Sequence, residues 1–471
     1  MKKIALLLLF LLPLTQLEAQ QIPGALAARV DSLFAEYTKP GSPGCAIAVV
    51  QKGQVVYSKG YGLANLEYDI PNAPGTVFHI ASDSKRFTTM AIVLLAQEGK
   101  LSLEDDIRKH LPEMPDFGKT ITIRHLANHT SGLRDQWALL ALAGWRLDDV
   151  STRDQIMKLV THQKELNFAP GEEHLYCNTG YSLMAEIVER VSGEPFRVFA
   201  EQRIFAPLGM NDTEVHDDHE QVVKNRAYSY YPDKDGFKNS VLSYANQGAT
   251  SLFTTAEDMA KWVINFNSGR FAGKQEVYQE MTRRGVLAKG DTLDYALGRK
   301  VNEHKGLKLV GHGGGDAGFR SFVGSFPEQQ FGVVVLGNVG NFNAFGKAMG
   351  IADLFLKDQQ KPAPAPVAKA APEVKKPAKK TKANPKLYDF YTGSYQLNPR
   401  LTLHVSREGD KLFVEPTGQG KFEIFPDGLH HFYLKVVDAQ LTFTQKGKEQ
   451  APEVTLHQNG QNTPARRVEP L

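Results

Sequence analysis

Short apolar runs rich in β-branched and aromatic residues lie near both ends of the region 20–358, and such runs bounded by turn residues are typical of strands. Residues 45–50 ("CAIAVV") and 55–60 ("VVYSKG") flank a Lys-Gly turn, and this pattern predicts a β-hairpin. Residues 319–326 ("FRSFVGSF") and 331–336 ("FGVVVL") flank a Pro/Glu/Gln turn and predict a second pair of strands. Strands are therefore expected near both ends of this region.

In the rest of this region the apolar positions recur every three to four residues, which indicates helices. The pattern predicts helices over residues 24–38, 87–99, 179–192 and 256–266, the third ending at Gly193. Strands at both ends with helices between them predict an α/β (α+β) fold. Its antiparallel sheet would be closed by strands from both ends of the region and flanked by helices, with a helical subdomain in the middle.

The C-terminal part of the chain has a different pattern. From Tyr388 onward, short apolar runs such as "RLTLHVS" and "HFYLKVV" recur every 8–12 residues, which predicts a small all-β barrel or sandwich. Residues 359–386 are a Pro/Ala/Lys tract without apolar periodicity, which is typical of a solvated, semi-rigid linker. We therefore expect one domain over residues 20–358, the linker, and a second domain over residues 387–471.

The first residues have the three-part pattern of a cleaved secretion signal. Lys2 and Lys3 precede an apolar run of about eleven residues, and Ala19 marks the expected end of a signal peptide over residues 1–19. Because this run is shorter than the roughly 20 residues that span a bilayer, we expect no stable membrane insertion. The mature protein is expected to be periplasmic or secreted.

Net charge and cysteines narrow the function classes. The formal charge is +3, but the linker contributes +7 and the signal +1, so the remaining residues carry 3 − 7 − 1 = −5. Nothing in this balance suggests a nucleic-acid partner.

Cys45 and Cys177 lie in unrelated segments, so we do not expect a disulfide. "HDDHE" (216–220) and His430-His431 lack a third ligand pattern, and neither a metal nor another cofactor is expected.

One stretch combines a hydroxyl with an amine. In "HIASDSKRFTTM", Ser82 and Lys85 are three residues apart, so a helix would place them on one face within contact distance. Partial burial disfavours the ammonium form of a lysine and makes it a usable base for a serine nucleophile. Backbone N–H groups at the start of a helix could also stabilise an oxyanion. Alone, however, Ser-x-x-Lys is more often a helix cap followed by a surface lysine.

Two further stretches strengthen the hypothesis. Tyr176-Cys177-Asn178 precedes a predicted helix; a phenol near cations loses its proton more easily, and an amide can hold a carbonyl group and a lysine. His312-Gly313-Gly314 opens a predicted strand, where glycines allow close backbone approach and the histidine can carry a proton. Each stretch alone also has an ordinary reading, as a packed aromatic residue or a Gly-rich loop.

Together and in this order, the three stretches resemble the serine β-lactamase and penicillin-binding protein superfamily. The nearest branch is that of class C β-lactamases and related D-peptidases and esterases. The stretches at residues 121–133 ("ITIRHLANHTSGL"), 207–213 ("PLGMNDT") and 252–262 ("LFTTAEDMAKW") also resemble this branch. The resemblance covers about residues 25–357, and the tail resembles the small β-barrels appended to such hydrolases.

The resemblance implies a catalytic role for three residues. Ser82 would attack a carbonyl carbon and form an acyl-enzyme, while Lys85 and Tyr176 would share the proton transfers. These roles predict hydrolysis, because a protein that only bound its ligand would not need the full set.

The resemblance also implies four substrate-binding positions. Asn178 would position the substrate, and His312 would orient Tyr176 or a substrate carboxylate. Gly314 belongs to the same strand motif, and the backbone N–H of Gly315, with that of Ser82, would form the oxyanion hole.

Two departures bear on the substrate. His312 stands where β-lactamases have a lysine, and Gly313 replaces a hydroxyl residue, so groups that would bind a carboxylate are absent. The sequence predicts an exported serine hydrolase acting on amide bonds of D-amino-acid peptides or β-lactams. An esterase and a non-hydrolytic β-lactam- or peptide-binding protein remain alternatives.

Residues 134–149, with Trp137 and Trp145, are either a wall of the substrate pocket or a helical hairpin packed on the core. The sequence predicts no oligomeric state.

Overall fold

The computed structural model describes residues 22–468 with interruptions at 147, 270–273, 361–383, 399–400, 417–420, 435–438, 446–448 and 459–460. The chain divides into two compact units, Met1–Ala365 and Pro366–Leu471, and each is described by itself. The predicted signal peptide and most of the predicted linker lie outside the described residues.

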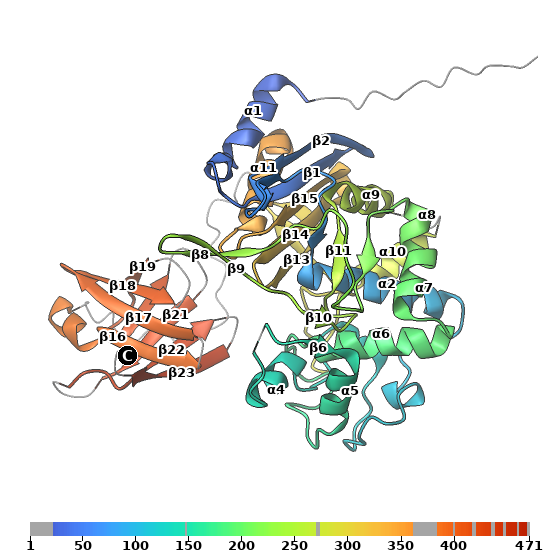
Figure 1. Cartoon of the computed structure of the whole chain (residues 1–471). Helices are drawn as coiled ribbons and strands as arrows, with labels where there is room; N and C mark the ends of the chain where they lie inside the picture. The colour runs from blue at the N-terminus through green and yellow to red at the C-terminus, as the bar shows by residue number, and fades with distance from the viewer. Residues whose placement is uncertain are drawn as a thin grey trace, which may run out of the picture. The chain divides into compact units, whose positions relative to one another are not determined.

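A six-stranded antiparallel sheet forms the centre of the first unit (Figure 1). Its strand order is β12-β13-β14-β15-β1-β2, with bounds β12 Lys300–His304, β13 Leu307–Asp316, β14 Phe319–Phe326, β15 Phe331–Gly337, β1 Cys45–Gln51 and β2 Gln54–Tyr61. Both predicted strand pairs are confirmed. β1 pairs with β15 from Cys45 opposite Gly337 to Gln51 opposite Phe331, so strands from both ends of the unit meet inside the sheet.

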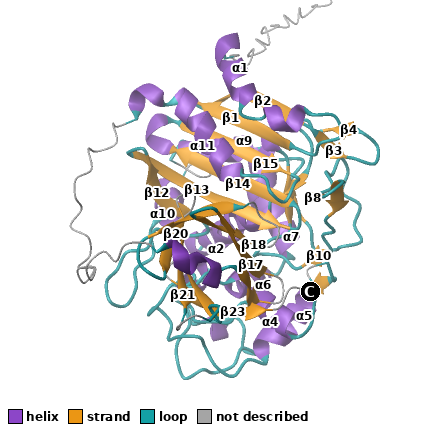
Figure 2. Ribbon diagram, turned by 90° about the vertical axis from the view of Figure 1, so that its left-hand side faces the viewer, coloured by secondary structure: helices purple, strands orange, loops and turns teal. Residues whose placement is uncertain are grey.

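Alternating side chains place a separate core on each face of the sheet. Ala46, Ala48 and Val50 of β1 join a core with the helices α2 (Lys85–Gln97) and α9 (Ala256–Asn267). Cys45, Ile47 and Val49 join a second core with α1 (Gly24–Ser32) and α11 (Ala344–Phe355). Helices therefore cover both faces of the sheet (Figure 2). This arrangement confirms the predicted fold class.

One predicted helix, over residues 24–38, is divided. α1 ends at Ser32, and a separate 3₁₀ helix follows over Ala35–Thr38. Phe34 lies between them outside helical geometry (φ −114°, ψ 8°), and both Phe34 and Tyr37 are buried in the second core. Val30, Phe34 and Tyr37 would also share one face of a continuous helix, so the apolar spacing does not reveal this break, which lies in the backbone at Phe34.

The remaining helices form the predicted helical subdomain and its connections to the sheet. Their bounds are α3 Ile123–Ala127, α4 Gln136–Leu142, α5 Arg153–Thr161, α6 Asn178–Ser192, α7 Phe196–Ala200, α8 Ala206–Leu208 and α10 Gln275–Thr282. α6 ends at Gly193, whose φ of 77° stops the helix where the sequence predicts. Short strands complete the unit: β3 Leu63–Asn65, β4 Ile70–Pro71, β5 Phe78–His79, β6 Ser151–Thr152, β7 Glu214–Val215, β8 Tyr230–Asp233, β9 Gly236–Asn239, β10 Tyr244–Ala245 and β11 Leu252–Thr254.

The second unit contains a closed eight-stranded barrel, so the tail is a barrel as predicted. Its strands are β16 Gly393–Asn398, β17 Leu401–Glu408, β18 Lys411–Pro416, β19 Phe422–Pro426, β20 His431–Leu434, β21 Ala439–Thr444, β22 Glu453–Gln458 and β23 Gln461–Val468. β16 pairs with β23 and closes the barrel. Side chains such as Tyr395, Phe432 and Phe443 fill a core within this unit.

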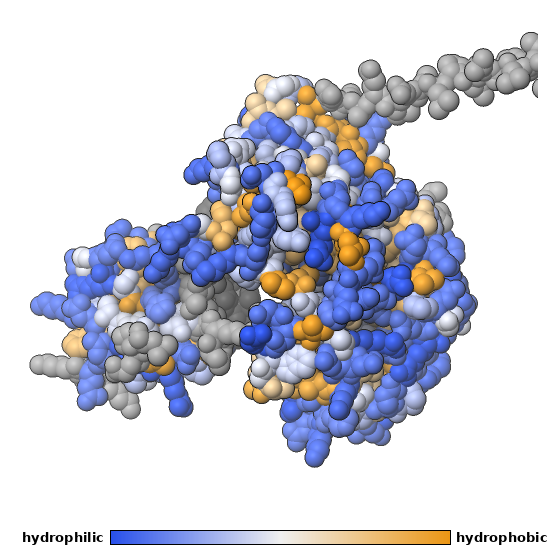
Figure 3. All heavy atoms as spheres, in the orientation of Figure 1, coloured by the Kyte–Doolittle hydropathy of each residue, from blue (hydrophilic) through white to orange (hydrophobic). Residues whose placement is uncertain are grey.

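Three further observations concern the cysteines, the length of the helices and the surface of the first unit. Both cysteines, Cys45 and Cys177, are buried free thiols. None of the helices in the described part of the chain is long and apolar enough to cross a membrane. On the face of the first unit visible in Figure 3, hydrophobic residues form separate spots among hydrophilic ones, as is usual for a protein surface in water.

Candidate active site

Ser82 lies in a 3₁₀ turn, Ala81–Ser84, between β5 and α2. The preceding Ala81 has a positive φ of 51°, which a non-glycine residue adopts only when its surroundings enforce it. The Ile80 backbone N–H donates to the Leu252 carbonyl oxygen (3.0 Å) and holds the start of this turn. The turn leaves Ser82 half-buried at the edge of a pocket, where its hydroxyl can meet a substrate.

Lys85 begins α2, a helix whose residues are buried on all sides from Lys85 to Leu95. Its Nζ lies 3.1 Å from Ser82 Oγ, and it donates to Asn178 Oδ1 (2.8 Å) and to the Ala249 carbonyl oxygen (2.8 Å). Burial lowers the pKa of this amine to about 7, although the Asp316 and Asp135 carboxylates oppose the shift. Much of the amine is therefore neutral at neutral pH.

The partners of Lys85 determine where its lone pair points. Asn178 Oδ1 and the Ala249 carbonyl oxygen can only accept hydrogen bonds, so they take the two N–H bonds of the neutral amine. The lone pair then faces Ser82 Oγ, the third neighbour. This is the geometry that a base needs to remove the serine proton.

Asp135 fixes the orientation of Asn178. Its Oδ2 accepts from the Asn178 backbone N–H (2.6 Å) and from Asn178 Nδ2 (2.9 Å), so Asn178 Oδ1 must face Lys85. Asp135 Oδ1 also accepts from the Trp137 backbone N–H and caps α4. Asp135 was not among the predicted site residues, because its local sequence indicates only a helix cap.

Tyr176 lies across the site from Lys85. Its ring centroid is 4.9 Å from Lys85 Nζ and 4.1 Å from the buried His129 ring. Although 38% of the residue is exposed, protein surrounding the hydroxyl raises the pKa of the phenol well above its ordinary value, and the Ser82 side chain offsets this only in part. The expectation that nearby cations promote loss of its proton is therefore wrong: burial dominates, and the resting phenol is protonated.

His312 lies in β13 beside Tyr176, with 6.3 Å between ring centroids. Nδ1 lies 2.6 Å from the Gly313 carbonyl oxygen, to which it donates, so Nε2 accepts from the Tyr295 hydroxyl (2.9 Å). Burial and the Lys85 and Arg86 cations hold its pKa well below the ordinary value. His312 is thus neutral, and its hydrogen bonds go to Gly313 and Tyr295 instead of the expected Tyr176 or substrate carboxylate.

Gly314 and Gly315 differ in what surrounds them. A Cβ at Gly314 would lie 2.1 Å from the Ile80 carbonyl oxygen and 3.0 Å from the Ala81 Cβ, so β13 packs directly against the turn that carries Ser82. A Cβ at Gly315 would meet only the Arg320 side chain, at 3.5 Å. Gly314 thus sets the spacing between strand and turn, while the Gly315 N–H stays the predicted second oxyanion donor.

Buried polar contacts stabilise this junction. Asp83 is fully buried and forms an ion pair with Arg86, and its Oδ2 lies 2.7 Å from Ser321 Oγ on β14. Burial raises the pKa of Asp83 to about 6, although Arg86 favours the charged form. Arg86 also reaches the Val323 carbonyl oxygen (3.2 Å), so the turn and β14 share one polar network.

The pocket at Ser82 has a volume of about 440 Å³, within the usual range for small-molecule sites. Tyr176, His312 and Gly313 line it, as do Lys300 and Asn302 of β12. No pattern in the sequence indicated these two β12 residues, which lie on an edge strand. Two tryptophans are not among the residues that line it: Trp137 and Trp145 pack against the first core, which favours the packing alternative for residues 134–149.

No group of three or more His, Cys, Asp or Glu residues in the described part of the chain could hold a metal ion. A serine nucleophile, a buried lysine of lowered pKa and a neutral phenol around one pocket define a serine hydrolase. Comparison with known proteins agrees with this class. Residues 30–356 match the model of the Beta-lactamase family, so this chain belongs to that family. Residues 377–467 match the model of a domain of unknown function, DUF3471.

Two curated proteins are similar in sequence to this chain. It is 28% identical over 441 residues to penicillin-binding protein 4* of Bacillus subtilis (strain 168), covering 90% of this chain and 94% of that protein. It is 29% identical over 297 residues to D-aminopeptidase of Brucella ovis, covering 63% of this chain but only 56% of that protein.

The structural likenesses show the fold. The octameric penicillin-binding protein homologue from Pyrococcus abyssi has a TM-score of 0.65 at 24% identity, covering 94% of this chain and 99% of that one. D-amino acid amidase from Ochrobactrum anthropi SV3 has a TM-score of 0.60 at 23% identity, covering 71% of this chain and 99% of that one.

Proposed function

We propose that this protein is an exported serine hydrolase that cleaves amide bonds next to D-amino acids, in peptides or amides, through an acyl-enzyme on Ser82. The observation that carries the proposal is the contact of Lys85 Nζ with Ser82 Oγ (3.1 Å), at a lysine whose pKa is about 7. The relatives named penicillin-binding protein and D-aminopeptidase support this substrate class. The N-terminal signal pattern supports export.

In acylation, the neutral Lys85 amine takes the Ser82 proton as Oγ bonds to the substrate carbonyl carbon. The carbonyl oxygen becomes an oxyanion, which the backbone N–H groups of Ser82 and Gly315 stabilise. The Tyr176 phenol gives its proton to the leaving nitrogen and takes one from the Lys85 ammonium. The carbon–nitrogen bond then breaks, leaving the acyl group on Ser82 and Lys85 neutral again.

Deacylation repeats these transfers with water. Lys85 accepts a proton from a water molecule as the water oxygen bonds to the acyl carbon. The backbone N–H groups of Ser82 and Gly315 stabilise the second oxyanion. The Ser82–acyl bond breaks, Ser82 Oγ recovers a proton from the Lys85 ammonium, and the carboxylic acid leaves.

The protonated phenol favours amide substrates over esters. An amine leaves only after its nitrogen is protonated, whereas many alcohols leave with less help. Tyr176 interacts with Ser82 and its raised pKa keeps its proton available at neutral pH. A phenol with a raised pKa can relay a proton from the Lys85 ammonium to the leaving nitrogen. Amide cleavage needs this step, whereas many esters are cleaved without it.

Lys300 can supply the cation that position 312 lacks. Neutral His312 does not attract a carboxylate, but Lys300 lines the same pocket. Its Nζ is 3.8 Å from Asp294, and both side chains are more than half exposed, so this ion pair is weak and Lys300 can hold a substrate carboxylate.

The test compares enantiomers and variants. Purified protein, Ser82→Ala and Lys85→Met would be assayed with p-nitroanilides of D-alanine and D-phenylalanine, with the L-enantiomers as matched controls. We expect turnover of the D-substrates only and loss of activity in both variants. Mass spectrometry after treatment with a fluorescent penicillin or a fluorophosphonate should find the adduct on the Ser82 peptide.

Esterase activity is the second candidate, because His312 and Gly313 replace the lysine and hydroxyl that would bind a carboxylate. Hydrolysis of p-nitrophenyl esters without any D-anilide turnover, with labelling by fluorophosphonate alone, would assign an esterase. If neither probe labels the folded protein, the hydrolase proposal is wrong and the protein binds its ligand without turnover.

A further inference from the structure

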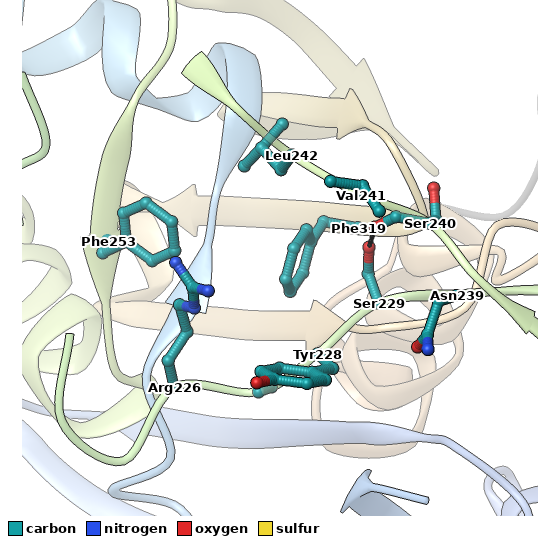
Figure 4. A pocket seen from close by; sticks show the side chains of 10 residues that line it. Arg226, Tyr228, Ser229, Asn239, Ser240, Val241, Leu242, Phe253 and Phe319 are labelled. Atoms are coloured by element: carbon teal, nitrogen blue, oxygen red, sulfur yellow. Dashed lines mark hydrogen bonds between the residues drawn. The ribbon is translucent and has the colours of Figure 1, made fainter. Parts of the chain in front are cut away.

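A second pocket, of about 210 Å³, lies next to the catalytic elements and does not include Ser82 among its lining residues (Figure 4). Two chain segments, residues 226–229 and 239–242, form one side of it, and the rings of Phe253 and Phe319 form the other. No step of the proposed mechanism uses this pocket, so its occupant needs a separate explanation.

The positions of the two phenylalanines connect the pocket with the catalytic centre. Phe253 of β11 is paired with His79, three residues before Ser82. Phe319 of β14 is paired with Asp316, the residue after Gly315. A strand advances about 3.3 Å per residue, so one or two residues of a substrate lying along β13 would extend from the oxyanion position to this pocket.

Arg226 gives the pocket its chemical character. Figure 4 shows its guanidinium directed into the space between the rings of Phe253, Phe319 and Tyr228. The guanidinium carbon lies 5.7 Å from the Phe253 ring centroid and 5.9 Å from that of Tyr228. The side chain is half-buried, yet it makes no hydrogen bond or ion pair with any residue that the structure describes.

This lack of partners indicates an anionic ligand. A guanidinium has five N–H donors, and withdrawing it from water is costly unless an acceptor compensates. Other half-buried arginines have such an acceptor: Arg108 is paired with Asp106 and Arg124 with Glu280. A ligand carboxylate could accept two parallel hydrogen bonds from the Arg226 guanidinium in the same way.

Two other polar side chains of the pocket are already engaged. Ser229 Oγ donates to the Ser240 carbonyl oxygen (3.0 Å), and Asn239 Nδ2 donates to Glu67 Oε1 (2.7 Å). The nearest acid on β13, Asp316, is bound by Thr250 and by His79 Nε2 (3.0 Å). Arg226 is therefore the cationic donor that this pocket offers to a ligand, and Glu67 disfavours an anion at the Asn239 end.

Resting on the proposed function, we propose that this pocket is a subsite for a carboxylate-bearing arm of the substrate. Arg226 binds the carboxylate, and the rings of Tyr228, Phe253 and Phe319 contact the carbon chain of the arm. The enzyme then prefers acidic D-aminoacyl substrates to neutral ones of equal size.

The test uses two substrates that differ only in charge: N-succinyl-D-alanine p-nitroanilide and its neutral N-succinamoyl counterpart. A hydrogen-bonded charge pair of this kind predicts a kcat/KM ratio of about 10–100 in favour of the succinyl substrate. In Arg226→Gln the ratio should approach 1, and Arg226→Lys should keep part of it. Lys224→Gln, which removes an exposed charge from the same segment, is the matched control and should keep the full ratio.

The proposal is overturned if the folded wild-type enzyme shows no preference, or if Arg226→Gln keeps it. If neither anilide is hydrolysed, the proposed function fails instead, and calorimetry still tests the subsite. N-succinyl-D-alaninamide should then bind Ser82→Ala about tenfold more tightly than the succinamoyl compound, and adding Arg226→Gln should remove the difference. Equal affinities, or no binding, would reject the subsite.

Discussion

Replacing Gly314 with alanine should separate folding from catalysis. The added Cβ would lie 2.1 Å from the Ile80 carbonyl oxygen, whereas a relaxed carbon–oxygen contact is about 3.3 Å, the lower end of the weak contacts seen between strands. β13 and the Ser82 turn must therefore move apart by roughly 1 Å. The Ser321 Oγ, at 2.6 Å, could turn aside, but the nearest obstructing atom is backbone and Ala81 Cβ is fixed to it, so no side-chain rotation relieves the whole clash.

This displacement has two measurable consequences. Overpacking should lower the free energy of unfolding by about 1–3 kcal/mol. Moving the Gly315 N–H away from the oxyanion by about 1 Å should lower kcat/KM roughly 100-fold, since misplacement of this size has such an effect on oriented reactions. Thermal unfolding measures the first effect, and stopped-flow acylation of Ser82 by a chromogenic substrate measures the second.

The neighbouring glycine provides the control. Gly315→Ala adds the same methyl group, but its nearest contact is the flexible Arg320 side chain at 3.5 Å, so stability and acylation should change little. Near-normal acylation by folded Gly314→Ala, or equal losses in the two variants, would refute the assigned contact between β13 and the Ser82 turn.

Four further predictions concern the charged groups around Ser82. Since Lys85 acts as a neutral base with a pKa of about 7, the acylation rate should rise from pH 5 to pH 8 and level off above it, and a flat stopped-flow profile would contradict this role. The folded state binds fewer protons at Lys85 than the unfolded state between pH 7 and 10.5, so unfolding titrations should show wild type gaining stability over Lys85→Met as pH rises through this window. Asp135→Ala should lower kcat about 10–100-fold in steady-state assays, because Asn178 loses two hydrogen bonds that orient it toward Lys85; an unchanged kcat would exclude this role. Lys300→Gln should raise KM about 2–5-fold for substrates with a free carboxylate and leave kcat unchanged, and an equal effect on carboxamide analogues would count against the assignment.

The sequence predicts best what depends on neighbours along the chain. Ser82 and Lys85 are three residues apart, and the apolar runs of β1, β2, β14 and β15 with the turns between them are local, so both can be predicted from the sequence. The antiparallel sheet, the helical subdomain and the barrel followed from the same periodicities.

Features that arise from distant contacts escaped prediction. Asp135 is separated by 43 residues from Asn178, and Tyr295 by 17 from His312, so no local pattern connects them. The direction of the Tyr176 pKa depends on how much protein surrounds its hydroxyl, which only tertiary structure defines. Lys300 lies opposite Gly311 in the pairing of β12 with β13, and this pairing places it at the pocket.

The pairing of β1 with β15 also has a consequence for biosynthesis. β1 ends at Gln51, but its partner begins at Phe331, and the strand that packs against the Ser82 turn ends only at Asp316. At a synthesis rate of about 5–20 residues per second, one edge of β1 waits roughly 15–60 s for its partner. During translation the nascent chain therefore exposes an apolar edge and lacks an assembled catalytic centre until β13 and β15 have been made.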